Sequence, residues 1–308
     1  MKTFCPWLWE EMFINEKGNV YSCCHQFPGK LGNIKDHSLK EIYSSTRLQS
    51  YRKKSLGGIL LCGTHCTLLS PAQRRSITHT DISAEYTTLK RLKICIGTAC
   101  NIRCIMCWQD HDNPKLLSLE LLKKQIDFST INEIDLQGGE PLFIPAALDF
   151  YKYCADHDVT INFLTNGMLL SDEWIENVIR HSKIITISLN AATAEMHEAV
   201  NLGSKWDTVL ANAKKLRQRR DDEKSSMQIL GHMTLIAKNV REVAQFIRKM
   251  DEFHFDRINF GFDQRLRIFL ALHPHLHKQL RAENKQAYEE CNDKSRIDLA
   301  RLRILKLI

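Results

Sequence analysis

Residues 100–107 read CNIRCIMC, so that Cys100, Cys104 and Cys107 follow a C-x-x-x-C-x-x-C spacing. The segment before them, 92–96, is apolar and β-branched, which predicts a strand, and the glycine at position 97 then predicts an abrupt turn. The three thiols therefore lie on a loop that leaves the end of a strand. Thiolates are soft ligands that suit zinc or an iron–sulfur cluster. Because this loop supplies three ligands and a four-iron cluster needs a fourth, one iron would stay open to a substrate or cofactor.

A second motif follows the next predicted strand. Residues 131–137 are strand-like, and they end in Gly138, Gly139, Glu140 and Pro141. Two glycines let the backbone approach a ligand closely, the glutamate adds a hydrogen-bond acceptor, and the proline stops the strand. An amino group bound at an open iron would find its acceptors here. Taken alone, the cysteine loop would equally allow a zinc site completed from elsewhere in the chain, or buried structural cysteines.

Together, CNIRCIMC after the first strand and GGEP after the second resemble the radical S-adenosylmethionine (SAM) superfamily. The resemblance implies that Cys100, Cys104 and Cys107 ligate a [4Fe–4S] cluster, whose fourth iron chelates SAM through its amino and carboxylate groups. One electron would cleave SAM to methionine and a 5′-deoxyadenosyl radical, which removes hydrogen from a substrate. An external one-electron reductant of the flavodoxin or ferredoxin type is part of this expectation.

The resemblance also assigns SAM contacts to the ends of several strands. Met106 takes the place beside adenine where relatives usually carry an aromatic residue, and its polarizable sulfur can pack there. Asn201 stands where relatives often place an arginine that clamps the SAM carboxylate, and His197 is interpreted as a helix-surface or packing histidine. The complete set of expected cofactor contacts is Met106, Gly138, Gly139, Glu140, Pro141, Asn166, Ser188 and Asn190.

From residue 89 onward, predicted strands and helices alternate. The strands are expected at 92–96, 131–137, 159–164, 184–190, 227–236 and 257–262. The intervening helices are expected at 119–128, 146–155, from 171 onward, at 206–219 and at 240–250. Near-continuous apolar strands separated by helices indicate an α/β fold with parallel strands. The resemblance implies a partial (β/α)6 TIM-like barrel, and each motif lies at the carboxyl end of a strand, where such barrels bind ligands.

The first seventy residues read as a separate metal-binding unit. Segments 12–14 and 19–21 flank a turn with Gly18 at a positive φ, which predicts a hairpin, and Ser38 can cap an amphipathic helix. Thiols from four points of this region could enclose a metal, with zinc or loose thiols as the alternatives. The expected ligands are Cys5, Cys23, Cys62 and Cys66, with Cys24, His25 and His65 as possible substitutes.

This unit resembles the auxiliary-cluster domain called twitch, a shortened SPASM domain, through Cys5, the G-x-x-x-x-C of residues 18–23 and the run of residues 31–42. The resemblance implies a second, auxiliary [4Fe–4S] cluster for electron transfer. The expected domains are the auxiliary-cluster domain at 1–70, a linker at 71–88, the radical SAM partial barrel at 89–265 and a C-terminal helical extension at 266–308.

Charge and cysteine content indicate which classes of partner and which cellular location to expect. The formal charge of +7, from 43 basic and 36 acidic residues, is spread along the chain, and the basic run 214–220 is followed directly by acidic residues. That pattern predicts a solvated helix end and not a nucleic-acid site. No secretory signal or membrane-length apolar run is found, and eleven cysteines fit a reducing interior with metal-bound thiolates. We therefore expect a cytoplasmic protein with no nucleic-acid or membrane partner.

Two functions remain open. The first is a radical SAM enzyme, an oxidoreductase or a peptide- or sugar-modifying enzyme, that acts on a small-molecule or peptide substrate. The sequence shows no leader-peptide-binding domain ahead of Cys5, so a peptide is not the favoured expectation. The second is a non-catalytic iron–sulfur or zinc-binding protein that transfers electrons or acts as a scaffold. Affinity for SAM separates the two.

Overall fold

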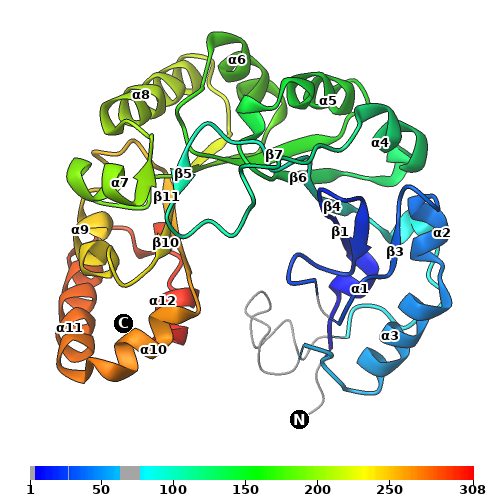
Figure 1. The fold of residues 1–308 in the computed structure, drawn as a ribbon, viewed down its shortest axis with the longest axis horizontal. Helices are drawn as coiled ribbons and strands as arrows, with labels where there is room; N and C mark the ends of the chain where they lie inside the picture. Colours follow the sequence, from blue (N-terminus) through cyan, green and yellow to red (C-terminus); the bar gives the residue numbers. More distant parts are fainter. Residues whose placement is uncertain (1–3, 27, 63–76) are drawn as a thin grey trace. The chain divides into compact units, whose positions relative to one another are not determined.

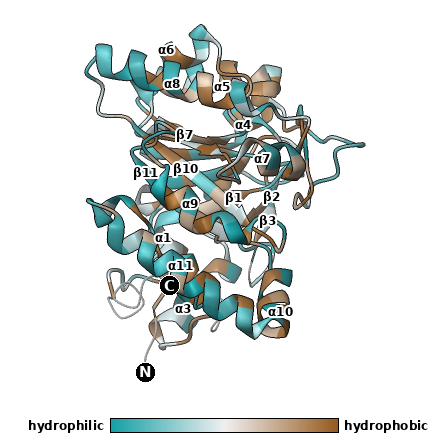
Figure 2. Cartoon of the chain, turned by 90° about the vertical axis from the view of Figure 1, so that its left-hand side faces the viewer, coloured by the Kyte–Doolittle hydropathy of each residue, from teal (hydrophilic) through white to brown (hydrophobic). Residues whose placement is uncertain are grey.

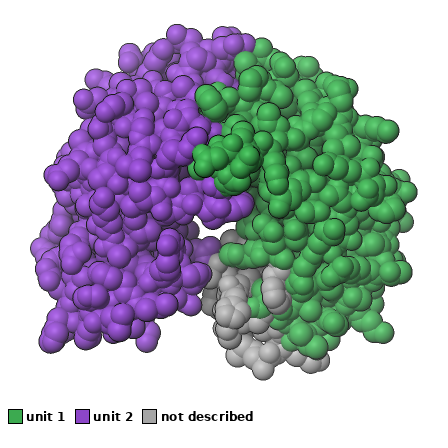
Figure 3. Space-filling model, viewed as in Figure 1, with its two compact units in different colours: residues 1–99, 110–162 green, residues 100–109, 163–308 purple. Residues whose placement is uncertain are grey.

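The computed structural model describes residues 4–26, 28–62 and 77–308. The chain divides into two compact units, which Figure 3 colours separately. Unit 1 comprises Met1–Ala99 and Asp110–Asn162, and unit 2 comprises Cys100–Gln109 and Phe163–Ile308. The boundary falls inside strand β7 (Thr160–Thr165), and both units contain parallel strand pairs.

Unit 1 is built on strands in the order β3-β2-β1-β4-β6. Apolar side chains of β4 and β6 such as Leu92, Ile94 and Ile134 are fully buried. In Figure 1, α4 and α5 lie beside β6. The strands are β1 (Glu11–Ile14), β2 (Asn19–Tyr21), β3 (Gly32–Asn33), β4 (Arg91–Cys95) and β6 (Glu133–Gln137). The helices are α1 (Trp7–Glu10), α2 (Leu39–Tyr43), α3 (Thr46–Leu56), η2 (Tyr86–Thr88), α4 (Leu119–Gln125), η3 (Phe128–Thr130), η4 (Pro141–Phe143) and α5 (Pro145–Ala155).

The N-terminal hairpin forms as the sequence predicts. Strands β1 and β2 pair antiparallel around Gly18, whose φ is +80°, and Asn15 accepts the turn's amide hydrogens. Ser38 and Glu41 form a reciprocal capping box at the start of α2. The sequence pattern did not show that β1 also pairs in parallel with β4, from Glu11 opposite Arg91 onward. The hairpin therefore extends the edge of the parallel sheet.

Two predicted helices end earlier than expected. Helix α4 stops at Gln125, because Ile126 is extended and Asp127 caps the short helix η3 that follows. The segment predicted as one helix at 240–250 consists of η5 (Val240–Glu242) and α9 (Val243–Arg248). Apolar spacing predicts that such segments are helical, whereas local side-chain caps set where each helix ends.

Unit 2 continues with β7, β8, β10 and β11, which are parallel neighbours in that order. Along β10, Ile229, Met233 and Leu235 are buried, and the alternating residues, His232 among them, form a more polar face. In Figure 2, α11 is largely hydrophilic on the side shown, and it packs against α9. The strands new here are β5 (Arg103–Cys104), β8 (Ile184–Ser188), β9 (Asn201–Leu202), β10 (Gln228–Leu235) and β11 (Arg257–Phe262). The remaining helices are α6 (Asp172–His181), α7 (Ala194–Val200), α8 (Trp206–Asp222), α10 (Arg265–Leu272), α11 (Pro274–Glu290), η6 (Lys294–Arg296) and α12 (Ala300–Ile304).

Strand order identifies the fold class. In unit 1, β4 and β6 are adjacent, and in unit 2, β7, β8, β10 and β11 follow one another in the order of the chain. A doubly wound sheet would instead reverse its order at a switch point, whereas a (β/α) barrel keeps chain order. The predicted α/β fold, a partial (β/α)6 TIM-like barrel, is confirmed at this level.

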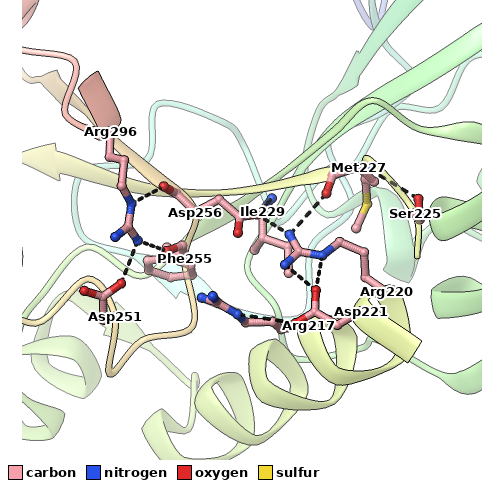
Figure 4. Close-up of polar contacts among 10 residues, drawn as sticks. All are labelled: Arg217, Arg220, Asp221, Ser225, Met227, Ile229, Asp251, Phe255, Asp256 and Arg296. Atoms are coloured by element: carbon pink, nitrogen blue, oxygen red, sulfur yellow. Dashed lines mark hydrogen bonds and ion pairs between the residues drawn. The ribbon is translucent and has the colours of Figure 1, made fainter. Parts of the chain in front are cut away.

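A charged network joins the end of α8 to the starts of β10 and β11 (Figure 4). The Arg220 guanidinium donates to the Met227 carbonyl at 3.2 Å and to the Asp221 carboxylate at 2.6 Å, and it forms a short ion pair with Asp256. Asp256 also accepts the Ile229 amide hydrogen at 2.7 Å. Arg220 is buried, so this last member of the predicted solvated basic run instead fixes the strands in unit 2.

Asp256→Ala is expected to lower the free energy of unfolding by about 2–4 kcal/mol, because it removes the acceptor of the Ile229 amide and one of the two carboxylates that pair with the buried Arg220 guanidinium. Urea denaturation measures this change. The control is Asp221→Ala, since that side chain is 55% exposed and also contacts Arg220. It should cost less than about 1 kcal/mol. Equal losses in the two variants would contradict a specific role for Asp256.

Candidate functional site

The cysteine loop belongs to unit 2, where β5 pairs antiparallel with β9 and Cys104 lies opposite Asn201. The Ile105 amide donates to the Val200 carbonyl at 2.9 Å, which continues this pairing. Cys104 is half-buried and Cys107 is exposed. The middle of the loop is therefore fixed by backbone hydrogen bonds, and its third cysteine faces solvent.

Asn166 contacts the start of the same loop from the end of β7. Its Nδ2 donates to Oδ1 of Asn101 at 2.8 Å and lies 3.9 Å from Sγ of Cys100. Its Oδ1 accepts the Met168 amide hydrogen at 3.0 Å, so the amide group has a defined orientation. Asn166 is 8% exposed. The asparagine that the sequence placed among the SAM contacts thus touches the first cysteine of the loop.

His197 on α7 and Asn201 on β9 form a buried, hydrogen-bonded pair of polar side chains. Nδ1 of His197 lies 2.5 Å from the Leu189 carbonyl, and its Nε2 lies 2.8 Å from the Ser204 hydroxyl. Asn201 Nδ2 donates to the same Leu189 carbonyl at 3.2 Å. Burial lowers the pKa of His197, although its contact with the carbonyl opposes this, so the ring is neutral near pH 7. His197 is completely buried, which makes it a packing histidine and excludes the surface alternative.

Asn190 follows β8 in a left-handed conformation with φ +60°. Its Oδ1 accepts the Thr234 amide hydrogen at 2.7 Å, and its Nδ2 donates to Asn201 at 3.0 Å. Its carbonyl accepts from Nδ2 of Asn239 at 2.9 Å. Ser188, the other predicted contact in this region, ends β8 and is half-buried. The Asn190 side chain therefore braces the carboxyl ends of β8 and β10.

The glycine motif lies in unit 1 and contacts the residues just before the cysteine loop. Gly139 donates its amide hydrogen to the Gly97 carbonyl at 2.7 Å, and Glu140 donates to the Ala99 carbonyl at 2.8 Å. A Cβ on Gly139 would lie 1.9 Å from the Ala99 oxygen, and one on Gly138, whose φ is +152°, would lie 2.3 Å from the Gly97 oxygen. Both positions therefore require glycine, because the two backbones touch.

Glu140 and Pro141 begin helix η4 (Pro141–Phe143) in unit 1. The Glu140 carboxylate accepts the Leu142 amide hydrogen at 3.1 Å, and Glu140 is 1% exposed. A backbone hydrogen bond joins the two ends of the segment that contains the cysteine loop: the Thr98 amide donates to the Lys115 carbonyl at 2.9 Å. Ala99, the acceptor for the Glu140 amide, directly precedes Cys100 in the sequence. The motif thus anchors the root of the loop.

A cavity of about 380 Å³ opens in unit 2 beside Met106. Its wall combines the residue before the third cysteine with the carboxyl ends of β10 and β11 and with α10. Apolar side chains dominate the lining, and Asp263 and Arg265 supply an ion pair. The lining residues are Ile105, Met106, Ile236, Ala237, Lys238, Asp263, Arg265, Leu266 and Phe269. Such a lining, mostly apolar with a few polar groups, is typical of small-molecule sites.

Three of the four expected N-terminal ligands belong to different segments of unit 1. Cys5 precedes α1, and its amide donates to the Ser55 hydroxyl of α3 at 2.9 Å. Cys23 follows β2, and Cys62 lies beyond the end of α3. All three are half-buried. The fourth expected ligand, Cys66, lies outside the described residues.

Sequence reasoning missed a charged group on the polar face of the unit 1 strands. Glu11 on β1 is 2% exposed and lies 3.2 Å from Nζ of Lys93 on β4. The Lys93 ammonium therefore pairs with this buried carboxylate. Burial raises the pKa of Glu11, and the positive charge of Lys93 opposes this. Only the parallel pairing of β1 with β4 brings these residues together, so no local pattern could reveal them.

The chemistry of the donors favours an iron–sulfur cluster at the cysteine loop. Three thiols come from one short loop, and thiolates are the ligands of such clusters. Within the described ranges, no group of three His, Cys, Asp or Glu side chains is placed to hold a metal ion. In a four-iron cluster each of the three thiolates would bind a different iron.

A parallel α/β sheet with a three-cysteine loop after its first βα strand defines a class of iron–sulfur proteins. The profile of the radical SAM superfamily matches residues 94–249, and that of SPASM, an iron–sulfur cluster-binding domain, matches residues 5–67. The chain belongs to the radical SAM superfamily. The predicted resemblance to both families is confirmed, and the families imply the predicted cofactors: a [4Fe–4S] cluster with SAM, and an auxiliary cluster.

Relatives of known activity match part of the chain. A serine-type anaerobic sulfatase-maturating enzyme of Klebsiella aerogenes is 30% identical over 149 residues, which cover 41% of this chain and 36% of that enzyme. The mycofactocin maturase MftC of Mycobacterium tuberculosis is 29% identical over 115 residues, which cover 35% of this chain and 29% of the relative. The chain thus spans about a third of the length of these curated relatives.

Solved structures resemble the chain at low identity. The crystal structure of Streptococcus suis SuiB matches with a TM-score of 0.47 and 13% identity, covering 66% of this chain and 47% of SuiB. No helix within residues 4–26, 28–62 and 77–308 has both the length and the apolar character needed to cross a membrane.

Proposed function

We propose that the protein is an enzyme that cleaves SAM reductively and removes hydrogen from its substrate. The observation that supports this most directly is the three-thiol loop, which lies inside the matched radical SAM region and is held by hydrogen bonds on β9 and at Asn166. When bound, the reduced cluster would supply the electron that cleaves SAM, and SAM would supply the 5′-deoxyadenosyl group that removes the hydrogen atom. The protein's own residues place the cofactors and exclude water.

We assign the cluster ligands to Cys100, Cys104 and Cys107. The cavity beside Met106 suits the adenine of SAM, because its wall is mostly apolar and offers a polarizable sulfur. Gly138, Gly139, Glu140 and Pro141 are assigned to the amino end of SAM, with Asn166, Ser188 and Asn190 as further contacts.

The auxiliary cluster is assigned to residues 1–70, with Cys5, Cys23, Cys62 and Cys66 as its ligands. This cluster would accept an electron from the substrate radical after hydrogen removal, which would allow a net oxidation of the substrate, or it would return an electron to that radical. Residues 71–88 act as a connection, 89–265 form the catalytic region and 266–308 form a helical extension. We further propose a flavodoxin- or ferredoxin-type reductant and a cytoplasmic location, which suit an oxygen-sensitive cluster.

A peptide or protein is the substrate class that we favour. The sulfatase-maturating relative is named for an action on a protein, and it shares 30% identity over its matched region. This departs from the expectation in the sequence analysis, where a peptide substrate was not favoured. A small molecule such as a sugar alcohol is the alternative. The match covers only about a third of each relative, so the parts that select the relatives' substrates can lie outside it.

The decisive test is anaerobic reconstitution with iron and sulfide, followed by SAM and dithionite. We expect 5′-deoxyadenosine, detected by mass spectrometry, in amounts that exceed the enzyme concentration. A SAM-binding titration with iron and sulfide analysis distinguishes the alternative, a non-catalytic scaffold. Bound metal without affinity for SAM and without 5′-deoxyadenosine would overturn the proposal.

A further inference from the structure

The Asn166 amide group is placed between a turn and the cysteine loop. Gly167, the next residue, has φ +77°, and its carbonyl accepts from Nδ2 of Asn212 at 2.8 Å. Asn166 Oδ1 caps the Met168 amide, and this contact directs its NH2 group to the other side. An amide is assigned from such partners, and here the acceptor and donor ends have different ones. The turn thus aims two N–H donors away from itself.

Those donors meet the first cysteine and its neighbour. The Nδ2 atom lies 2.8 Å from Oδ1 of Asn101 and 3.9 Å from Sγ of Cys100. All of these residues belong to unit 2, and Asn166 is almost completely buried. Such a contact stabilises negative charge on sulfur more than it would in water, because little solvent competes.

Hydrogen bonds to cluster sulfurs are one of the factors that set the reduction potential. Reduction adds negative charge to the cluster and its thiolates, and a fixed N–H donor stabilises the reduced form more than the oxidised form. We propose that Asn166 is a positioning residue that holds Cys100 through Asn101 and raises the reduction potential of the SAM-binding cluster. This role rests on the proposed function, and it differs from contact with SAM itself.

The test compares Asn166→Asp and Asn166→Ser with the unaltered protein in an anaerobic redox titration followed by EPR. Both variants keep an acceptor for the Met168 amide, and both lose the NH2 donors. The ratio of reduced to oxidised cluster at a fixed potential should fall by up to about tenfold, a shift of ~59 mV to more negative values. Asn166→Asp should shift it further than Asn166→Ser, because its carboxylate repels the thiolate.

Asn212→Ala is the matched control. Asn212 contacts the same turn through the carbonyls of Gly167 and Met168, on the side of the turn that Asn166 does not use. It should weaken thermal stability without moving the potential. An unchanged potential in both Asn166 variants with full iron content would overturn the inference, as would an equal shift in Asn212→Ala.

Two readouts separate this inference from the proposed function. The SAM-binding cluster is identified in the unaltered protein by the change in its EPR signal when SAM is added. Absence of any SAM-responsive signal there means that the proposed function fails. A SAM-responsive signal whose midpoint potential is insensitive to Asn166 means that only the inference fails. If one Asn166 variant loses its cluster, the other still supplies the midpoint potential, and loss of iron from both but not from Asn212→Ala supports the contact with Cys100.

Discussion

Cys104→Ala is expected to abolish formation of 5′-deoxyadenosine, a loss of more than about 100-fold, since even residues that only orient metal ligands typically contribute 10–100-fold. Cys104 lies on β5, whose pairing with β9 fixes the backbone on either side of the thiol. Iron bound after reconstitution should fall by roughly half, because the auxiliary site would keep its own cluster.

The control for this substitution is Cys291→Ala. Cys291 follows α11 and is also half-buried, but it lies far from the loop in sequence, and its thiol donates to the Asp293 carbonyl at 3.4 Å. It should retain full iron and full SAM cleavage. Iron and product are measured in the same anaerobic samples. Substantial 5′-deoxyadenosine from Cys104→Ala would refute the assignment of this cysteine as a ligand.

Local chemistry explains what could be predicted from the sequence. The strand at Arg257–Phe262 begins and ends where its apolar pattern does, and Ser38 and Ser171 cap their helices as expected. The cysteine spacing and the GGEP motif identify the superfamily, because both are short and contiguous in the chain. Such features depend on neighbouring residues, which a sequence displays directly.

Features that depend on contacts between residues far apart in the chain could not be predicted from the sequence. The contact of Glu11 with Lys93 requires β1 to join the edge of β4, and nothing within either strand specifies that partner. The same holds for Asn190 and Asn201, whose amides bond to each other across 11 residues. Each asparagine alone resembles a loop residue or a ligand contact. Its structural role is visible only when the partner is in place.

For Gly138 and Gly139, the sequence predicted the position of the motif but gave only part of the reason why glycine is needed there. They were expected to let the backbone approach a ligand. In the structure, Gly138 and Gly139 approach the backbone of Gly97 and Ala99. A role toward SAM remains part of the proposal, but the close backbone contact already demands glycine. The motif therefore ties the strand end of β6 to the root of the cysteine loop.

Gly139→Ala is accordingly expected to destabilise the protein by about 3 kcal/mol or more, and to reduce iron incorporation at the SAM-binding site. The new Cβ would lie 1.9 Å from the Ala99 oxygen and 2.6 Å from the Thr98 carbonyl carbon, and both are backbone atoms that cannot rotate away. Overpacking of this kind typically costs 1–3 kcal/mol, and more when the backbone must move. Thermal and urea unfolding measure the first effect, and iron analysis measures the second.

Gly57→Ala separates this effect from the general consequence of adding a methyl group. Gly57 has φ −70°, and its nearest contact for a Cβ is the Lys54 carbonyl oxygen at 3.3 Å, so alanine should change stability by less than about 1 kcal/mol. Because Ala99 directly precedes Cys100, displacement at Ala99 must move the first cysteine. A Gly139→Ala protein with unaltered stability and full iron would show that the loop root tolerates displacement, and the anchoring role of the glycine motif would then be wrong.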